Sequence, residues 1–428
     1  MSNQSTADRG KPGRAVAGVD APPISGMAQL SDYEEIWEVL RSRKFLQGQY
    51  PVSGKQMMRD TVPTLDGEAH LKRRRVLAQL FNDEAVAEQR TRHLLPMIDQ
   101  CLAEAAEGST GAVVMADLVP LVQRCLYRVA ASVVGIDGLE SVDAADRLIG
   151  YVRAIAPGIT IDWTREDPNT VLARAMAARD AFRDEFFDPS FRARLNAVSR
   201  GKAAGAGTTT GAGDALTLML MHRDDAWAGD EALILRETTL LLNASTQTTA
   251  IAFTGLVLRL ERWLAVHPED RQKIETDPEF LRRAVFESLR MTVSTPARIR
   301  IATEDVTLAS GRRVSSGEAV ALLFLPANQD SGRFGEAGEE YNPGRGVVDG
   351  TPPWGLCFGA GAHTCPGRPL ITGSRNPTGR IDVDGTLVSL GRRFYSAGLR
   401  LDPDRPPVSD TGTHYDIYSS VPIMLMNP

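Results

Sequence analysis

The segment WGLCFGAGAHTCPGRPL, residues 354–370, is the stretch on which the interpretation of the whole sequence depends. Within it, a pattern F-G-x-G-x-H-x-C-x-G is formed by Phe358, Gly359, Gly361, His363, Cys365 and Gly367. A large flat group can approach a cysteine in such a turn closely, because glycines permit positive φ and carry no side chain. Backbone N–H groups of the turn, and the start of the helix that follows, stabilise a thiolate. The pattern therefore predicts a thiolate metal ligand at Cys365, with one open face.

The other cysteines are assigned to the packed interior. Cys357 stands eight residues before Cys365 and lacks the glycine spacing that follows it, so we expect a packed small side chain there. Cys101 and Cys125 fall in helical patterns and are expected in the core. Four cysteines in 428 residues cannot form a disulfide framework, and they fit a reducing cytoplasm.

The composition is that of a globular protein with an acidic balance. Hydrophobic residues make up 43% and charged residues 24%, and the formal net charge is −6. This balance argues against nucleic acid as the main partner. No run reaches the ~18–20 apolar residues of a membrane span, so we expect a cytoplasmic protein without membrane contact.

The chain is expected to form a tail and one domain. Residues 1–25 are polar and rich in Gly and Pro, and they lack the apolar core of a signal peptide, so we expect a disordered tail. Residues 26–428 are expected to form one large domain. The stretch SRGKAAGAGTTTGAG (199–213) is too small and polar to pack and is expected to be a surface connector.

Periodicity predicts a mainly α fold with small β-sheets late in the chain and a long central helix. Ser31 and Glu34 have the capping-box spacing at the start of an early helix. Helices are expected at about 31–42, 69–81, 86–107, 115–135, 140–155, 167–197, 230–263 and 278–291. The helix at 230–263 is apolar nearly all round, which is typical of a helix buried at the centre of a large protein. Strands are expected in RIRIATEDVTL, RRVSSGEAVALLF and SSVPIMLM.

The sequence resembles the cytochrome P450 family over about residues 30–428, and in that family a cysteine thiolate is the proximal ligand of a haem iron. FESLR carries Glu287 and Arg290 at the family's E-x-x-R spacing, on one face of a helix. YNPGR supplies Arg345 as the third member of a structural Glu–Arg–Arg network, and ANQD (327–330) resembles the family's A-N-R-D.

The resemblance implies haem b, iron protoporphyrin IX, as the cofactor. His70 and Arg74 match the H-x-x-x-R pair that grips the haem propionates, and RIATEDV places Arg300 on a propionate. The residues expected to contact the cofactor are His70, Arg74, Ala244, Arg298, Arg300, Phe358, Gly359, His363, Cys365 and Gly367.

The resemblance also implies a reaction: a small organic molecule is oxidised with O2, two electrons and two protons, in a biosynthetic pathway. We find no flavin or nicotinamide motif, so the electrons are expected from a separate ferredoxin or flavodoxin-type donor. Lys72, Arg73 and Arg75 are expected to form a basic face that attracts this acidic donor, with a merely solvated basic helix as the alternative.

The central helix departs from the family pattern. Residues 244–249 read A-S-T-Q-T-T where bacterial members usually have A-G-x-(Asp/Glu)-T-T. Thr248 occupies the alcohol position, and Gln247 replaces the acid; Gln can orient water but cannot ionise. One interpretation is a monooxygenase that passes protons through Thr248 and water. The other is a P450 with non-hydroxylating chemistry: ring formation, coupling, desaturation or nitration.

A rival from another class is a P450-like binding module without catalysis. Cys365, Arg290 and Arg345 argue against it, since such a module need not keep a thiolate loop. The family normally places a helix and two strands before the first helix that we expect here, and their absence argues mildly for the module. After Gly367 the stretch ITGSRNPTGRIDVDG (371–385) also breaks the usual proximal helix.

Substrate contacts are expected at Leu240, Asn243, Pro296 and Arg298. Arg298 lies two residues before Arg300, so both point to the same side of a strand. The pair suggests a polar or anionic substrate, and the alternative is that Arg298 is another propionate contact.

Overall fold

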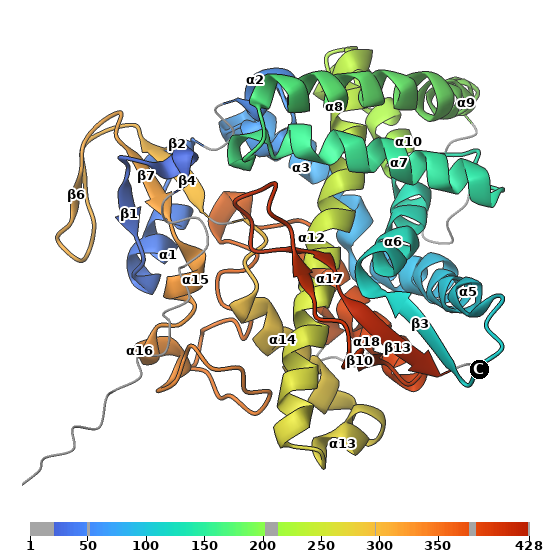
Figure 1. Cartoon of the computed structure of the whole chain (residues 1–428). Coiled ribbons are helices and arrows are strands. Elements are labelled where there is room, and N and C mark those ends of the chain that lie inside the picture. The colour runs from blue at the N-terminus through green and yellow to red at the C-terminus, as the bar shows by residue number, and fades with distance from the viewer. Residues whose placement is uncertain (1–20, 49–51, 202–212, 296, 376–381, 427–428) are drawn as a thin grey trace, which may run out of the picture.

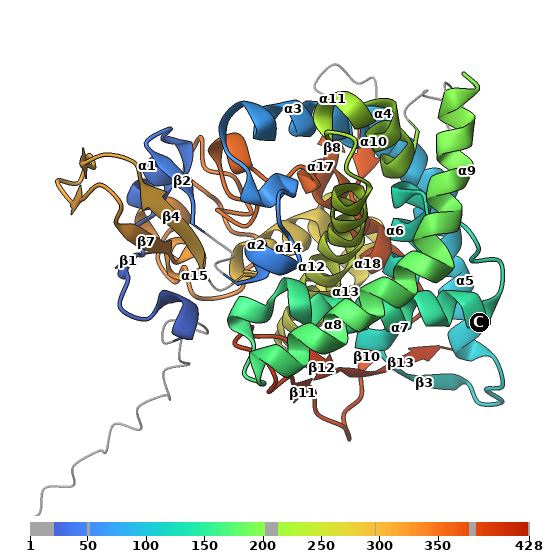
Figure 2. The same cartoon turned by 90° about the horizontal axis from the view of Figure 1, so that it is seen from above.

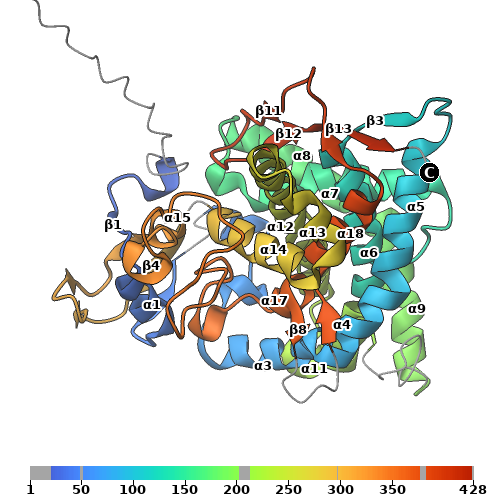
Figure 3. The same cartoon turned by 90° about the horizontal axis from the view of Figure 1, so that it is seen from below.

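The computed structural model describes residues 21–48, 52–201, 213–295, 297–375 and 382–426 (Figure 1). These residues form a mostly helical fold with small sheets, which confirms the predicted fold class. The central helix α12 (Glu231–Val266) has 36 residues and runs through the middle of the molecule (Figures 1–3). None of the helices in the described ranges is long and apolar enough to cross a membrane.

The helices surround α12 on several sides. Those before it are α1 (Tyr33–Arg41), α2 (Ser53–Gln56), α3 (Gly67–Leu77), α4 (Asp83–Gln89), α5 (Leu95–Ala106), α6 (Leu118–Val134), α7 (Val142–Ile159), α8 (Pro168–Phe182), α9 (Asp188–Ser199), α10 (Ala215–Met221) and α11 (Arg223–Ala226). Those after it are α13 (Asp270–Thr276), α14 (Pro278–Met291), α15 (Phe324–Ala327), α16 (Ser331–Phe334), α17 (Arg368–Thr372) and α18 (Thr386–Ser396). Single π turns, Arg90–Leu94 and Arg183–Phe187, join α4 to α5 and α8 to α9.

The largest sheet of the described residues lies to one side of the helices, at the left of Figure 1. Its order is β1 (Ala28–Leu30), β7 (Ala319–Leu322), β4 (Arg298–Ala302), β2 (Phe45–Gln47), and only the β1–β7 pair is parallel. A second sheet has the order β10 (Arg400–Leu401), β13 (Pro422–Met426), β3 (Val113–Asp117). Two-stranded pairs are β5 (Val306–Thr307) with β6 (Arg313–Val314), β8 (Gly373–Arg375) with β9 (Asp382–Asp384), and β11 (Val408–Ser409) with β12 (Tyr418–Ser420).

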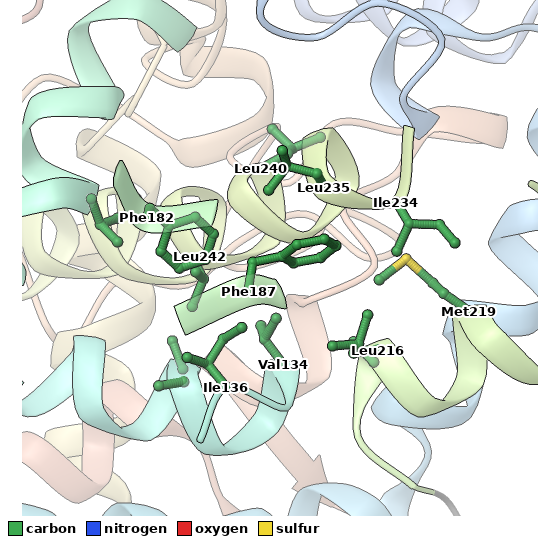
Figure 4. Close-up of a cluster of buried hydrophobic side chains, with 14 of the residues drawn as sticks. Val134, Ile136, Phe182, Phe187, Leu216, Met219, Ile234, Leu235, Leu240 and Leu242 are labelled. Atoms are coloured by element: carbon green, nitrogen blue, oxygen red, sulfur yellow. The ribbon is translucent and has the colours of Figure 1, made fainter. Parts of the chain in front are cut away.

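The core explains why α12 is apolar nearly all round. Its first half packs into a cluster with α6, α7, α10 and the π turn before α9, in which Leu242 and Phe187 lie side by side (Figure 4). Its second half packs into another cluster with α5, α6, α14 and α18. The helix starts where the Asp230 carboxylate accepts the N–H of Leu233 at 3.0 Å. The prediction of a buried central helix is confirmed.

Two boundaries differ from the sequence prediction. The cap of α1 is Asp32 rather than Ser31, because the Asp32 carboxylate accepts the N–H of Glu35 at 2.9 Å. The predicted helix at 115–135 begins only at Leu118: Val113–Asp117 is strand β3, which pairs with β13. That pairing joins residues about three hundred positions apart, so local periodicity does not reveal it.

The packed part of the chain starts earlier than the predicted boundary at residue 26. Pro22–Ile24 form a 3-10 turn, and Ala21 and Ile24 are buried against Trp163 and strand β7. Residues 1–20 lie outside the described ranges, so the tail predicted there stays a prediction. Between Ala21 and α1 the structure has this turn and strand β1.

The predicted interruption of the proximal helix is confirmed. Helix α17 ends at Thr372, the β8–β9 hairpin follows, and α18 begins at Thr386. At the base of the hairpin the two arms lie so close that an added Cβ at Gly373 would be 2.1 Å from the Val383 carbonyl oxygen. Asp384 then anchors the hairpin by accepting from Arg282 at 2.7 Å and from Arg392 at 3.0 Å.

Candidate active site

The loop before α17 presents Cys365 by a pair of tight glycine turns. Gly359 and Gly361 have φ of +66° and +68°, which a residue with a side chain rarely adopts. The Cys365 N–H donates to the Phe358 carbonyl at 2.8 Å and closes the loop. Gly361 also packs against α1, where an added Cβ would be 2.3 Å from the Leu40 carbonyl oxygen. These constraints explain the glycine pattern of the sequence.

The Cys365 side chain is reachable by solvent yet lies deep in the fold. Burial raises the pKa of its thiol, while the N–H groups of Gly367 and Arg368 and the charges of Arg298 and Arg74 act in the opposite direction. Burial has the larger effect, so the pKa of the thiol stays raised, and the backbone donors and the two guanidinium groups offset only part of that rise. The surroundings suit a thiolate that is stabilised further by a bound cation.

Cys357 has a different environment. Its Sγ donates to the Thr292 carbonyl at 3.6 Å, and burial raises the pKa of the thiol to about 12. It is therefore a neutral, packed thiol, as predicted. Cys101 and Cys125 are buried in the core between α5 and α6, which also confirms the prediction.

The predicted propionate residues come together beside the cysteine loop. His70 on α3 stacks on His363 of the loop, with ring centroids 4.1 Å apart. Burial, together with the charges of His363 and Arg74, lowers the pKa of His70 to about 4, so His70 is a neutral hydrogen-bonding group at pH 7. Asp66 also contacts His363, with its Oδ1 3.0 Å from the His363 Nε2.

Strand β4 brings two arginines to the same cluster. Arg300 is buried and donates to Gln47 of strand β2, and Gln47 in turn contacts His363 at 3.3 Å. Arg298 lies near enough to Cys365 to stabilise its thiolate electrostatically, as does Arg74 of α3. Helix α17, which follows the Cys365 loop, lies between α3 and α12 (Figures 2 and 3). Sequence reasoning missed Gln47 and Asp66, since neither belongs to a recognisable motif.

The middle of α12 contains an exposed segment inside an otherwise buried helix. Ala244 and Thr248 are exposed, and the Thr248 hydroxyl donates to the Ala244 carbonyl at 2.7 Å. Gln247 is half-buried and turned towards α6, where its Nε2 donates to the Tyr127 hydroxyl at 2.5 Å. The structure therefore brings Ala244 and Thr248 to the open face, and it engages Gln247 elsewhere. Ser245, which sequence reasoning left out, is exposed beside them.

The three residues of the expected Glu–Arg–Arg network lie together. Glu287 accepts from Arg290 at 2.7 and 2.8 Å and from Arg345 at 2.9 Å, and all three side chains are buried. Arg290 also donates to the carbonyl oxygens of Asn328 and Gly338, each at 2.6 Å. A buried ion pair with this many hydrogen bonds fixes the geometry around it.

Asn328 connects this network to the cysteine loop. Its Nδ2 donates to the Arg290 carbonyl at 2.9 Å, and its Oδ1 accepts the Leu356 N–H at 2.7 Å. Gly355 has a φ of +56°, and an added Cβ there would be 2.2 Å from the Asn328 Oδ1. The ANQD motif thus positions the loop that carries Cys365.

The predicted basic face is only partly present. Arg73 is buried: it donates from Nε to the Ala226 carbonyl at 2.8 Å and lies over the Trp227 ring. Its assignment to a surface is therefore wrong, because α10 and α11 pack against this side of α3. Lys72 pairs with Asp225 at 2.5 Å, and Arg75 is exposed.

The predicted substrate residues that the structure describes lie on two elements, α12 and β4. Leu240 and Asn243 are buried on α12, and the Asn243 Nδ2 donates to the Thr239 carbonyl at 3.0 Å. Pro296 lies outside the described residues. Arg298 belongs to the cluster around Cys365, which favours the cofactor interpretation over the substrate one.

The residues present fit a haem. An accessible thiolate ligand, neighbouring arginines and histidines for two propionates, and small or polar exposed groups on α12 are the donor set that such a group requires. Among the described residues there is no cluster of three His, Cys, Asp or Glu side chains for a bare metal ion.

The chain is similar to bacterial proteins, one of which is named a cytochrome P450. No protein-family model matches the chain. The chain is 27% identical over 393 residues to the mycinamicin IV hydroxylase/epoxidase of Micromonospora griseorubida, covering 89% of this chain and 85% of that protein. It is 28% identical over 207 residues to cytochrome P450-SU2 of Streptomyces griseolus, covering 48% of this chain and 46% of that protein.

Solved structures resemble the whole fold. The epothilone D-bound cytochrome P450epoK superposes with a TM-score of 0.67 at 18% identity, covering 93% of this chain and 90% of that one. The alignments with the first curated relatives span less than half of those proteins, from 39% to 46% of their length.

Proposed function

We propose a function from one premise: the chain belongs to the cytochrome P450 family. We infer that it is a haem-thiolate monooxygenase that oxidises a small organic molecule with O2 and electrons from a separate donor. The observation that carries this proposal is the accessible Cys365 thiol, on which the charges of Arg74 and Arg298 both act. The related hydroxylase/epoxidase acts in mycinamicin chemistry by its name, which supports a role in natural-product biosynthesis.

Haem b is the cofactor that we propose, and the chain's own residues divide into two groups around it. Cys365 would hold the iron, and the glycines of its loop would leave room for the ring. His70, Arg74, Arg298, Arg300 and His363 would hold the propionates. When bound, the haem supplies oxygen activation, and the thiolate promotes cleavage of the O–O bond.

The exposed segment of α12 would serve the proton steps. Thr248 donates its own proton to the Ala244 carbonyl, so its oxygen is left to accept a hydrogen bond from a water molecule. Ala244 is small and leaves space beside it. Substrate would contact Leu240, Asn243 and Pro296, with Arg298 assigned to the cofactor.

Electrons would come from a ferredoxin or flavodoxin-type protein that docks on the side of Cys365. Exposed Arg75 and half-exposed Lys72 on α3 would contribute to that surface. The β8–β9 hairpin adds an element to the same side of the molecule, next to α17 (Figure 3).

One observation favours a second candidate function. Gln247 cannot ionise, and α6 holds its amide away from the exposed face. A reaction in which the substrate itself supplies a proton, such as ring formation or coupling, would tolerate this arrangement.

The experiment uses the haem-loaded full chain with a surrogate ferredoxin and its reductase. A library of small organic molecules is screened for a shift of the ferric Soret band, and binders are turned over under ¹⁸O₂. A product heavier by one ¹⁸O atom supports monooxygenation. An oxidised product without label supports the second candidate. Normal ferric and reduced spectra without any oxidised product across the binders contradict both.

A further inference from the structure

Two hydroxyls, rather than one, face the open side of α12. Ala244, Ser245 and Thr248 are exposed, whereas the neighbouring Thr246 and Thr249 are buried. Residues three apart lie on the same face of a helix, so Ser245 and Thr248 are neighbours there. The family pattern has glycine at the position of Ser245. This chain therefore lacks the acid of the pattern and has an additional hydroxyl one turn earlier.

Both hydroxyls donate their protons to backbone carbonyl groups of α12. The Ser245 Oγ donates to the Leu241 carbonyl at 2.7 Å, and the Thr248 Oγ1 donates to the Ala244 carbonyl at 2.7 Å. A hydroxyl has one donor and two acceptor lone pairs. Each oxygen is thus left as an acceptor, and a water molecule next to the pair must point its hydrogens at them.

Gln247 does not compete for this water. Its Nε2 donates to the Tyr127 hydroxyl at 2.5 Å, and its Oε1 accepts from Gln123 at 3.3 Å. Tyr127 is buried, and burial raises the pKa of its phenol to about 12, so it stays a neutral partner of the amide at pH 7. Both ends of the glutamine side chain are therefore held by α6.

We propose that Ser245 is a positioning residue which, together with Thr248, holds the water that delivers protons at the open face of α12. This inference rests on the proposed function. The held water gives up one proton to the reacting oxygen, and a proton that comes from bulk solvent converts the hydroxide that remains back to water. Ser245 thereby takes part of the role that the acid has in the family pattern.

The test compares Ser245→Ala, which removes the hydroxyl, with Ser245→Thr, which keeps it. The first readout is the crystal structure of each haem-loaded variant. We expect an ordered water within hydrogen-bond distance of both hydroxyls in the unchanged protein and in Ser245→Thr, and its loss in Ser245→Ala. The inference is overturned if the unchanged protein holds no such water or if Ser245→Ala keeps it in place.

The second readout is the ratio of product to hydrogen peroxide per electron pair, in H₂O and in D₂O. We expect Ser245→Ala to lower the ratio by about twofold to tenfold, which corresponds to the net free energy of one hydrogen bond. We also expect it to change the solvent isotope effect on the ratio. Ser245→Thr should restore both. Unchanged ratio and isotope effect in Ser245→Ala would overturn the inference. If the unchanged protein forms no oxidised product, the proposed function fails, and the crystallographic water still decides the role of Ser245.

Discussion

Asn328 shows how one side chain links the structural network to the chemistry. It joins the Arg290 carbonyl to the Leu356 N–H, and it is fully buried. Its replacement by alanine would leave both backbone groups without a partner in the interior. The position of Cys365 therefore depends on a residue far from it in the sequence.

We expect Asn328→Ala to lower the free energy of unfolding by about 2–5 kcal/mol, because each stranded buried group costs about 1–3 kcal/mol. Urea unfolding of the haem-loaded protein measures this. Asn169→Ala, an exposed position on α8, is the control and should change stability by less than about 0.5 kcal/mol. Equal stability of the two variants would refute the linking role of Asn328.

Arg298 tests the assignment of the arginine cluster. Because its charge stabilises the Cys365 thiolate, Arg298→Ala should lower the haem-to-protein ratio after purification, and Arg298→Lys should restore part of it. Arg313→Ala, an exposed arginine on β6, is the control and should retain full haem content. Normal haem content with weakened substrate binding in Arg298→Ala would return this residue to the substrate site.

At this scale the sequence predicted that Glu287, Arg290 and Arg345 come together, because the E-x-x-R pair demands specific residue types at a fixed spacing. The role of Cys365 as an iron ligand stays a prediction. Gln47, Asp66 and Tyr127 escaped prediction, since their contacts bridge distant segments and many polar side chains would meet the same need. Arg73 was assigned wrongly because a run of basic residues does not show which of its faces α10 and α11 cover.

Among the elements, the loop before α3 is tied to α12 by buried charged groups. Arg236 donates from Nε to the Arg59 carbonyl at 2.9 Å, and Glu237 accepts the Val62 N–H at 3.2 Å. Burial raises the pKa of Glu237 to about 7, although the Val62 N–H and the charges of Arg73 and Arg236 oppose this. This carboxyl therefore titrates near neutral pH.

A raised carboxyl pKa makes the folded state lose stability as pH rises. In the unfolded chain Glu237 titrates near 4.5, so its contribution is fully present below about pH 4.5 and is lost by about pH 7. We expect Glu237→Gln to be more stable than the unchanged protein above pH 7 by about 3 kcal/mol, and equally stable near pH 4.5. Urea unfolding at several pH values measures the difference. A difference that is independent of pH would contradict the buried, titrating carboxyl.

The hairpin between α17 and α18 depends on a close approach of backbones. An added Cβ at Gly385 would be 2.1 Å from the Ile371 carbonyl oxygen. Gly385→Ala should therefore lower stability by about 1–3 kcal/mol through overpacking. Gly150→Ala is the matched control: Gly150 is an exposed residue of α7 with open space around it, and alanine there should be neutral or stabilising. Unfolding midpoints of both variants decide the point, and equal values would rule out the close approach.

For the whole molecule, the order of the motifs predicted the fold and the long buried helix, since those features follow from periodicity and from fixed motif spacing. The interruption after Gly367 was also visible as a change in composition. Strand β3 and the packing of Ala21 and Ile24 were not, because both depend on partners from distant parts of the chain. The tail was predicted over residues 1–25; residues 21–25 belong to the packed part, and for residues 1–20 the tail stays a prediction.

The central claim is that Cys365 is the thiolate ligand of a haem, and the optical spectrum of the reduced, CO-bound protein tests it most directly. Cys365→Ser and Cys357→Ser form a matched pair, eight residues apart in the same segment. The account predicts the red-shifted Soret band of thiolate ligation in the unchanged protein and in Cys357→Ser, and its loss in Cys365→Ser. A band that survives in Cys365→Ser, or that disappears only in Cys357→Ser, would contradict it.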